Sequence, residues 1–168
     1  MSTTEPSVIL RTEYLVHAIG QLLVDRTPAH WAAITFSAEC TTSVSTYDLM
    51  IATVDSEPTR HEISQEVYEK VETLRRVMYQ PDKGAWFSMV LEITADGEYS
   101  TSFDYDGPPK TEQYKPEWTP QTYALDLQEF PRSRTNIPQW LQDKLSAARP
   151  TGGAGGAFNG SEAAGGQA

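Results

Sequence analysis

In one stretch of the sequence, apolar and polar residues alternate so regularly that the stretch constrains the fold around it. Between Trp86 and Pro109 the chain reads WFSMVLEITADGEYSTSFDYDGPP, with two alternating runs on either side of Asp96-Gly97. An Asp-Gly pair in this position favours a tight reversal, so the stretch predicts a β-hairpin. Its expected apolar side consists of Phe87, Met89, Leu91 and Ile93 on the first strand and Tyr99, Thr101, Phe103 and Tyr105 on the second. This side must pack against helices, whereas the other side stays in water.

The water-facing side of the predicted hairpin is acidic. Its expected members are Trp86, Ser88, Val90 and Glu92 on the first strand, and Glu98, Ser100, Ser102 and Asp104 on the second. From Gly84 to Pro109 the chain carries five carboxylates (Glu92, Asp96, Glu98, Asp104 and Asp106) and no Lys or Arg. Alternation accounts for the spacing of these acids but not for the absence of bases. We therefore expect this side to meet a cationic partner.

Helices and further strands flank the hairpin. Apolar residues recur at helical spacing from Val8 to Leu22 and from Ile63 to Met78, and a proline follows each range. Strand-like runs occupy residues 30–38 and 45–54, and shorter helices are expected at about 120–129 and 138–148. The predicted fold class is α+β, with an antiparallel sheet of about four strands, helices packed mainly on one face, and the order α-β-β-α-β-β-α-α.

The composition changes near the end of the chain. Residues 151–168 hold seven of the eleven glycines and a single aromatic residue, Phe158. Such a segment buries too little apolar surface to offset the entropy lost on ordering. We expect one folded domain over residues 1–149 and a disordered Gly/Ala-rich tail over residues 150–168.

The overall charge excludes several classes of partner. The chain has 13 Lys and Arg against 23 Asp and Glu, a net charge of −10, which repels nucleic acid and anionic membranes. The alternative to a cationic partner is that the negative charge only keeps the protein soluble. The chain has one cysteine, Cys40, no basic leader at its start, and no apolar run approaching the roughly 18 residues of a membrane span. These features predict a cytoplasmic protein without an internal disulfide.

The sequence contains no recognisable catalytic or metal-binding motif. The GxSxG, HExxH, phosphate-loop and CxxC patterns are all absent. Asp104 and Asp106 begin like a calcium loop, but two prolines follow Gly107 and the later ligands are missing. A lone buried cysteine is usually a small core residue, although Cys40 paired with a histidine remains an alternative. We predict no catalytic residues, no metal, no cofactor and no small-molecule substrate.

The hairpin and the segment after it resemble the YezG-type immunity proteins of bacterial polymorphic toxin systems. The resemblance covers roughly residues 84–145 and rests on GAWFSMVLEITADGEYSTSFDYDGPP followed by FPRSRTNIPQWLQDKL. The matching residues are Trp86, Asp96, Gly97, Phe103, Asp104, Tyr105 and Asp106. The string IPQWL and the Gly/Ala-rich tail are similar to the actinobacterial branch, whereas the first 80 residues match only in length and element order.

The resemblance implies an antitoxin that binds the C-terminal toxin domain of a secreted protein. Related immunity proteins neutralise nucleases and NAD glycohydrolases, whose basic clefts an acidic surface would complement and occlude. The expected partner-binding carboxylates are Glu92, Glu98, Asp104 and Asp106. The expected aromatic contacts are Trp86, Tyr99 and Trp118, although Trp86 and Tyr99 also suit the core.

Two other functions remain open at this point. A small acidic chaperone or adaptor for a secreted protein shares the low pI and the α+β organisation, and it would bind an extended segment of its cargo. An enzyme that uses Cys40 or a histidine is the third possibility, and the absence of any catalytic spacing argues against it.

Overall fold

The computed structural model describes residues 6–148 and has α+β architecture. Its elements are α1 (Val8–Val24), β1 (Trp31–Cys40), β2 (Ser45–Thr53), β3 (Ser56–Arg60), α2 (Gln65–Val77), β4 (Ser88–Thr94), β5 (Tyr99–Asp104), η1 (Lys110–Tyr114), α3 (Pro120–Glu129), η2 (Arg134–Asn136) and α4 (Gln139–Ala147). The sheet has five strands in the order β3-β2-β1-β4-β5, and all neighbours are antiparallel. The expected α+β class is confirmed, while the tail predicted for 150–168 lies outside the described residues.

The expected count of about four strands misses β3. All five residues of β3 are exposed, so the strand has no alternation of apolar and polar side chains for a pattern to detect. It also contains Pro58, which lacks the amide hydrogen that a central strand needs. The observed order is therefore α-β-β-β-α-β-β-α-α, with β3 added at the edge beside β2.

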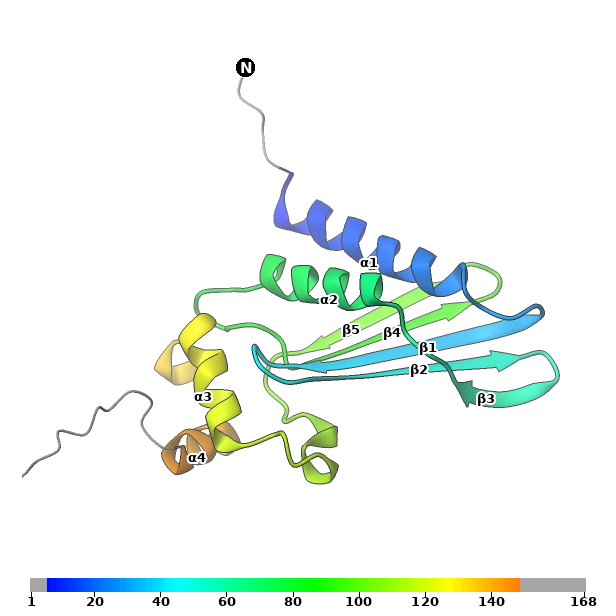
Figure 1. The fold of residues 1–168 in the computed structure, drawn as a ribbon. Helices are drawn as coiled ribbons and strands as arrows, with labels where there is room; N and C mark the ends of the chain where they lie inside the picture. The colour runs from blue at the N-terminus through cyan, green and yellow to red at the C-terminus, as the bar shows by residue number, and fades with distance from the viewer. Residues whose placement is uncertain (1–5, 149–168) are drawn as a thin grey trace, which may run out of the picture.

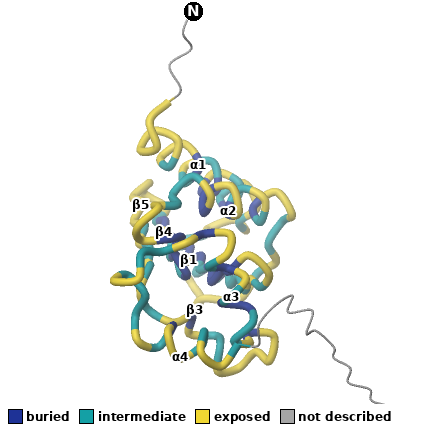
Figure 2. Tube along the Cα trace, turned by 90° about the vertical axis from the view of Figure 1, so that its left-hand side faces the viewer, coloured by how far each residue is buried: buried dark blue, intermediate teal, exposed yellow. Residues whose placement is uncertain are grey.

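The two long helices cover one face of the sheet, and α3 and α4 lie at one end of it (Figure 1). The main core lies between α1, α2 and the sheet, where Figure 2 shows the buried residues gathered. Ile19 of α1, Phe36 of β1, Val71 of α2 and Leu91 of β4 each have 0% of their surface exposed. Burial at roughly 25 cal/mol per Å² of apolar surface makes this layer the main stabilising contact of the fold. Among the described residues, no helix is both long and apolar enough to cross a membrane.

The predicted hairpin is formed by β4 and β5. The amide of Gly97 donates to the carbonyl of Thr94 at 2.9 Å, and the amide of Thr94 donates to the carbonyl of Glu98 at 3.0 Å. Gly97 has a φ of +95°, a left-handed conformation that glycine adopts without strain. Met89, Leu91 and Ile93 alternate into the core as expected, each at most 1% exposed.

Trp86 does not lie on the water-facing side, where the alternation had placed it. Its surface is 0% exposed, and its ring packs 5.6 Å from that of Phe103 in the main core. Ser88 is paired with Asp104, and the amide of Phe87 also donates to the carbonyl of Asp104. Two consecutive residues therefore oppose one, which is the arrangement of a β-bulge and reverses the alternation before Ser88.

A second, smaller core joins the C-terminal helices to the end of the sheet. Its buried members are Phe87, Trp118, Tyr123 and Leu141. Trp118, an expected partner contact, is only 5% exposed and packs 6.1 Å from the ring of Tyr123. Trp118 therefore belongs to this core rather than to the surface.

Two buried arginines attach this smaller core to the rest of the molecule. Arg75 of α2 donates to both carboxylate oxygens of Asp126 of α3, at 2.7 and 2.9 Å, and to the carbonyl of Trp86 at 2.7 Å. Arg132 donates to the carbonyls of Ala85 and Tyr105. Paired and hydrogen-bonded in this way, the guanidinium groups tolerate burial.

Candidate functional site

The face of the sheet turned away from α1 and α2 is the candidate functional site, and we call it the open face. Residues paired across an antiparallel sheet project to the same side, so the row Met50–Thr35–Glu92–Ser100 crosses four strands on this face. The same register gives the other members. They are Ala33, Ser37 and Glu39 on β1, Thr46, Asp48 and Ala52 on β2, Arg60 on β3, Ser88, Val90 and Thr94 on β4, Ser102 and Asp104 on β5, and Glu98 opposite Thr94.

Glu92 and Glu98 are the free carboxylates of the open face. Both side chains are exposed, and neither takes part in an ion pair among residues 6–148. They line a hollow of about 560 Å³ together with Thr35, Thr94 and Ser100. Ile34, Ile93 and Tyr99 also border this hollow, but their side chains project to the helix side of the sheet, where Ile34 is 0% and Ile93 1% exposed. The site therefore combines two negative charges with short, mostly polar side chains from β1, β4 and β5.

Asp104 lies on the open face, but its carboxylate is engaged locally. One of its oxygens accepts hydrogen bonds from the amides of Asp106 at 2.9 Å and Gly107 at 2.8 Å. These bonds turn the chain at the end of β5, before Pro108 and Pro109. Asp104 thus adds negative charge to the face while it also shapes the end of the strand.

Asp106 lies beyond the end of β5 and belongs to the contact with the C-terminal helices. Its carboxylate is 3.4 Å from the guanidinium of Arg132, and its carbonyl accepts a hydrogen bond from the indole of Trp140 at 2.6 Å. The side chain of Asp106 remains 78% exposed, whereas that of Arg132 is 1% exposed. The structure therefore brings Glu92, Glu98 and Asp104 onto one face and separates Asp106 from them.

None of the three expected aromatic contacts projects from the open face. Trp86 and Trp118 are buried in the two cores. Tyr99 is 39% exposed, but the β5 register turns it toward α1, where its ring approaches Gly20 and lies 5.9 Å from that of His17. The open face as defined above contains no aromatic residue. Short Ser, Thr and Ala side chains make this face nearly flat instead.

Sequence reasoning missed the part of the open face contributed by β1 and β2. The alternation of Ala33, Thr35, Ser37 and Glu39 with buried neighbours was a usable signal for β1. Glu39 is only 8% exposed because its carboxylate accepts hydrogen bonds from the amides of Lys110 at 2.6 Å and Thr111 at 2.9 Å. These contacts hold η1 against the sheet.

Positive charge lies beside the β1, β2 and β3 part of the open face, where Arg60, Lys110 and Lys115 line a hollow with Glu39 and Asp48. Arg60 of β3 lies 2.7 Å from Asp48 of β2, which neutralises much of its charge. No basic residue lies on the β4 and β5 strands, which carry Glu92 and Asp104. The acidic half of the face is thus separated from Arg60 by β1 and β2.

Cys40 is in an environment that disfavours a nucleophile. The thiol is 3% exposed, and burial raises its pKa above the ordinary value of 9.0. The hollow of about 90 Å³ beside it is lined by Thr41, Thr42, Ser45, Glu72, Arg75, Arg76, Glu129 and Phe130, and no histidine is among them. A raised pKa keeps the thiol protonated at neutral pH. Within residues 6–148, no group of His, Cys, Asp and Glu is placed to hold a metal ion.

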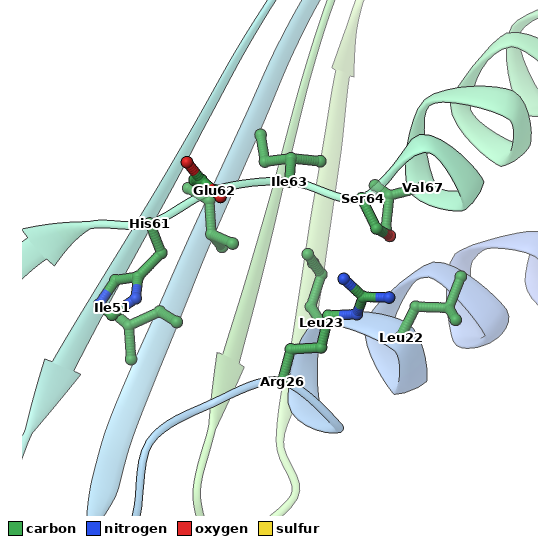
Figure 3. A pocket seen from close by; sticks show the side chains of 10 residues that line it. Leu22, Leu23, Arg26, Ile51, His61, Glu62, Ile63, Ser64 and Val67 are labelled. Carbon is green, nitrogen blue, oxygen red and sulfur yellow. The ribbon is translucent and has the colours of Figure 1, made fainter.

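A hollow of about 300 Å³ lies on the helix side of the sheet, between the end of α1 and the start of α2 (Figure 3). Its floor is formed by Leu23, Ile51 and Val67, which are buried. Arg26 and His61 reach it from opposite sides (Figure 3). The side chains in view form no hydrogen-bonded pair across the hollow, so we interpret it as a surface depression over the core.

Comparison of the chain with models of known protein families and with curated protein sequences found no match.

Proposed function

We propose that the chain is an immunity protein that binds a cognate toxin domain stoichiometrically and occludes its basic active-site cleft. The observation that carries the proposal is the pair of exposed, unpaired carboxylates of Glu92 and Glu98 beside a hollow of about 560 Å³. Within the described part of the chain, the fold gives these two charges no ion-pair partner. They are therefore available to a cationic group on another molecule.

The relief of the open face suits a large protein partner. Ser100 and Ser102 on β5, and Thr35 and Ser37 on β1, are short side chains that let a second surface approach the sheet closely. Negative charge on such a surface speeds the encounter with a positive cleft by about 10-fold to 10³-fold at low salt. A nuclease cleft and an NAD glycohydrolase cleft both handle phosphates, so both present the required positive charge.

Trp86 and Trp118 are buried and so do not contact a partner. The proposal therefore requires the partner to supply the side chain that anchors the complex. A partner Lys or Arg can place its aliphatic stem over the short side chains of Ala33 and Thr35 while its charged head meets Glu92 and Glu98. Arginine suits this geometry because its planar guanidinium pairs with carboxylates through two parallel hydrogen bonds. The proposal therefore assigns the acidic hollow, rather than an aromatic residue of this chain, as the receiving part of the interface.

The test is a binding titration with the cognate toxin domain that the proposal requires. The double variant Glu92→Lys/Glu98→Lys is expected to weaken binding by at least about 100-fold, since each attraction becomes a repulsion. Glu13→Lys/Glu66→Lys is the matched control, because it makes the same change of net charge at exposed positions on α1 and α2. If both variants lose the same affinity, the effect comes from net charge alone. If neither variant loses affinity, the open face is not part of the interface.

A small acidic chaperone is a second candidate, favoured by one observation. The first turns of α1 expose apolar side chains, with Val8 56%, Ile9 69%, Leu10 58% and Tyr14 70% exposed. A chaperone would use such a surface to hold an unfolded segment of a secreted protein. Binding to a folded toxin domain supports the immunity function, whereas binding only to an unfolded segment supports the chaperone.

A further inference from the structure

The two edges of the sheet differ in how they are protected. At one edge, β3 contains Pro58, and its pairing with β2 shifts register between Ile51 and Thr53. At the other edge, β5 runs from Tyr99 to Asp104 without a proline, a lysine or a register shift. Proline, lysine and bulges are the features that block strand addition at exposed edges. Between Tyr99 and Phe103 the β5 edge has none of them, and the bulge of the β4–β5 pair lies beyond this stretch, opposite Asp104.

The register of the hairpin determines which backbone groups of β5 point outward. The hydrogen bond between the Thr94 amide and the Glu98 carbonyl fixes the alternation, so Ser100 and Ser102 direct their backbone groups toward β4. Tyr99, Thr101 and Phe103 then direct theirs away from the sheet. Within residues 6–148, no loop or side chain hydrogen-bonds to the backbone of these three outward residues. Figure 2 shows β5 mostly exposed.

We propose that β5 accepts an extended basic segment of a partner protein as a sixth strand of the sheet. The inference rests on the proposed function, and it specifies how the partner is held. Exchange of amide and carbonyl bonds with Tyr99, Thr101 and Phe103 can supply about six hydrogen bonds. Beside the added strand, Glu98 and Asp104 carry negative charge near the two ends of β5. Lysine or arginine at alternate positions of the segment complements these charges.

Charge also argues against a second copy of this chain as the occupant. In an antiparallel pairing of β5 with itself centred on Thr101, Glu98 of each copy faces Asp104 of the other. Like charges directly opposite across a strand pair are destabilising. The edge therefore favours a basic segment over self-association.

Amide exchange with a defined probe tests the edge directly. The probe is a seven-residue peptide of alternating lysine and valine with both ends blocked, mixed with the intact protein. The amides of Thr101 and Phe103 should exchange at least about tenfold more slowly with the peptide, because they gain hydrogen bonds. The amides of Ser100 and Ser102 should change little, because they already bond to β4. Unchanged exchange at Thr101 and Phe103 would overturn the proposal.

The matched probe is the same peptide N-methylated at the residues that would bond to β5. It keeps every charge but cannot donate along the edge, so protection of Thr101 and Phe103 should disappear. Equal protection by both peptides would show attraction by charge alone and would also overturn the strand addition. Self-association would appear as protection that depends on protein concentration without any peptide, and it too would count against a basic segment.

A pair of substitutions carries the test to the toxin domain. Thr101→Pro removes an outward amide and leaves the bonds to β4, so it should weaken binding by about tenfold, whereas Thr101→Val should bind as the parent does. If Glu92→Lys/Glu98→Lys abolishes binding while Thr101→Pro does not, the strand addition is wrong and the proposed function stands. If the lysine–valine peptide protects the edge but the toxin domain does not bind the protein, the strand addition stands and the proposed function is wrong. Because the exchange experiment uses the parent protein, its result decides the proposal even when the proline variant is unstable.

Discussion

The acidic half of the open face and the contact between the sheet and the C-terminal helices use carboxylates in opposite ways. At the helix contact, Asp126 is 2% exposed, and its oxygens accept hydrogen bonds from the guanidinium of Arg75 and from the amide and hydroxyl of Thr42. On the open face, Glu92 and Glu98 are exposed and form no ion pair with a described residue. The first kind of carboxylate holds the fold together, while the second leaves its charge free for a partner.

This difference separates stability from binding within a single chain. A buried carboxylate with a full set of donors cannot be changed without leaving those donors unpaired, which costs free energy of folding. An exposed carboxylate remains hydrated in both the folded and the unfolded chain, so its removal changes the stability little. The comparison therefore predicts a graded series of effects on the free energy of unfolding, and the position of each carboxylate decides its rank.

The largest effect is expected for Asp126→Ala. The substitution leaves the guanidinium of Arg75 buried without its anion, and the side chain of Arg75 is only 5% exposed. Loss of one partner of a buried pair typically costs about 3–5 kcal/mol of unfolding free energy. Urea unfolding followed by circular dichroism measures this loss.

The double variant Arg75→Met/Asp126→Leu is the control for the Asp126 prediction. It removes both charges and refills the space with apolar atoms, so it should be less destabilised than Asp126→Ala. A loss of unfolding free energy below about 1 kcal/mol in Asp126→Ala would show that the Arg75–Asp126 pair contributes little to stability. The buried and the exposed carboxylates would then not differ in the way proposed.

An intermediate effect is expected for Glu39→Ala, which lies on the open face but behaves like a structural carboxylate. The amides of Lys110 and Thr111 lose their acceptor, and a loss of about 1–3 kcal/mol follows from leaving such donors unpaired. Glu92→Ala is the matched control, because it removes the same group from the neighbouring strand. Equal stabilities of the two variants would show that burial does not separate the carboxylates of this face.

The regular elements were predictable because their signals are local. The helix expected at about 120–129 is observed as Pro120–Glu129, and the Asp-Gly turn closes β4 and β5 as expected. The apolar period of α2 buries Val67, Val71 and Leu74 against the sheet. In each case neighbouring residues in the sequence carry the information, so a single chain suffices to find the element.

The errors came from features that depend on distant parts of the chain. The bulge before Ser88 turned Trp86 into the core, and an alternating pattern cannot reveal an extra residue in a strand. Trp118 is buried by α3 and α4, which Arg75 and Asp126, 51 residues apart, help to fix in place. Likewise, the hairpin sequence contained all four carboxylates expected to bind a partner. Only the folded chain shows that Glu92 and Glu98 form no ion pair with a described residue, whereas Asp104 and Asp106 are held by contacts within the protein.

The smallest effect on stability, and the sharpest contrast with Asp126, is expected for Glu92→Gln/Glu98→Gln. Both side chains are exposed and keep their shape as amides, so the unfolding free energy should change by no more than about 0.5 kcal/mol. Toxin binding should nevertheless weaken, and the fall of its association rate with rising salt should become shallower, because two of the steering charges are gone. Stopped-flow association at several salt concentrations, alongside urea unfolding, measures both quantities on one sample. A stability loss as large as that of Glu39→Ala would mean that the hairpin acids serve the fold, whereas an unchanged salt dependence would mean that the partner's positive charge is directed elsewhere.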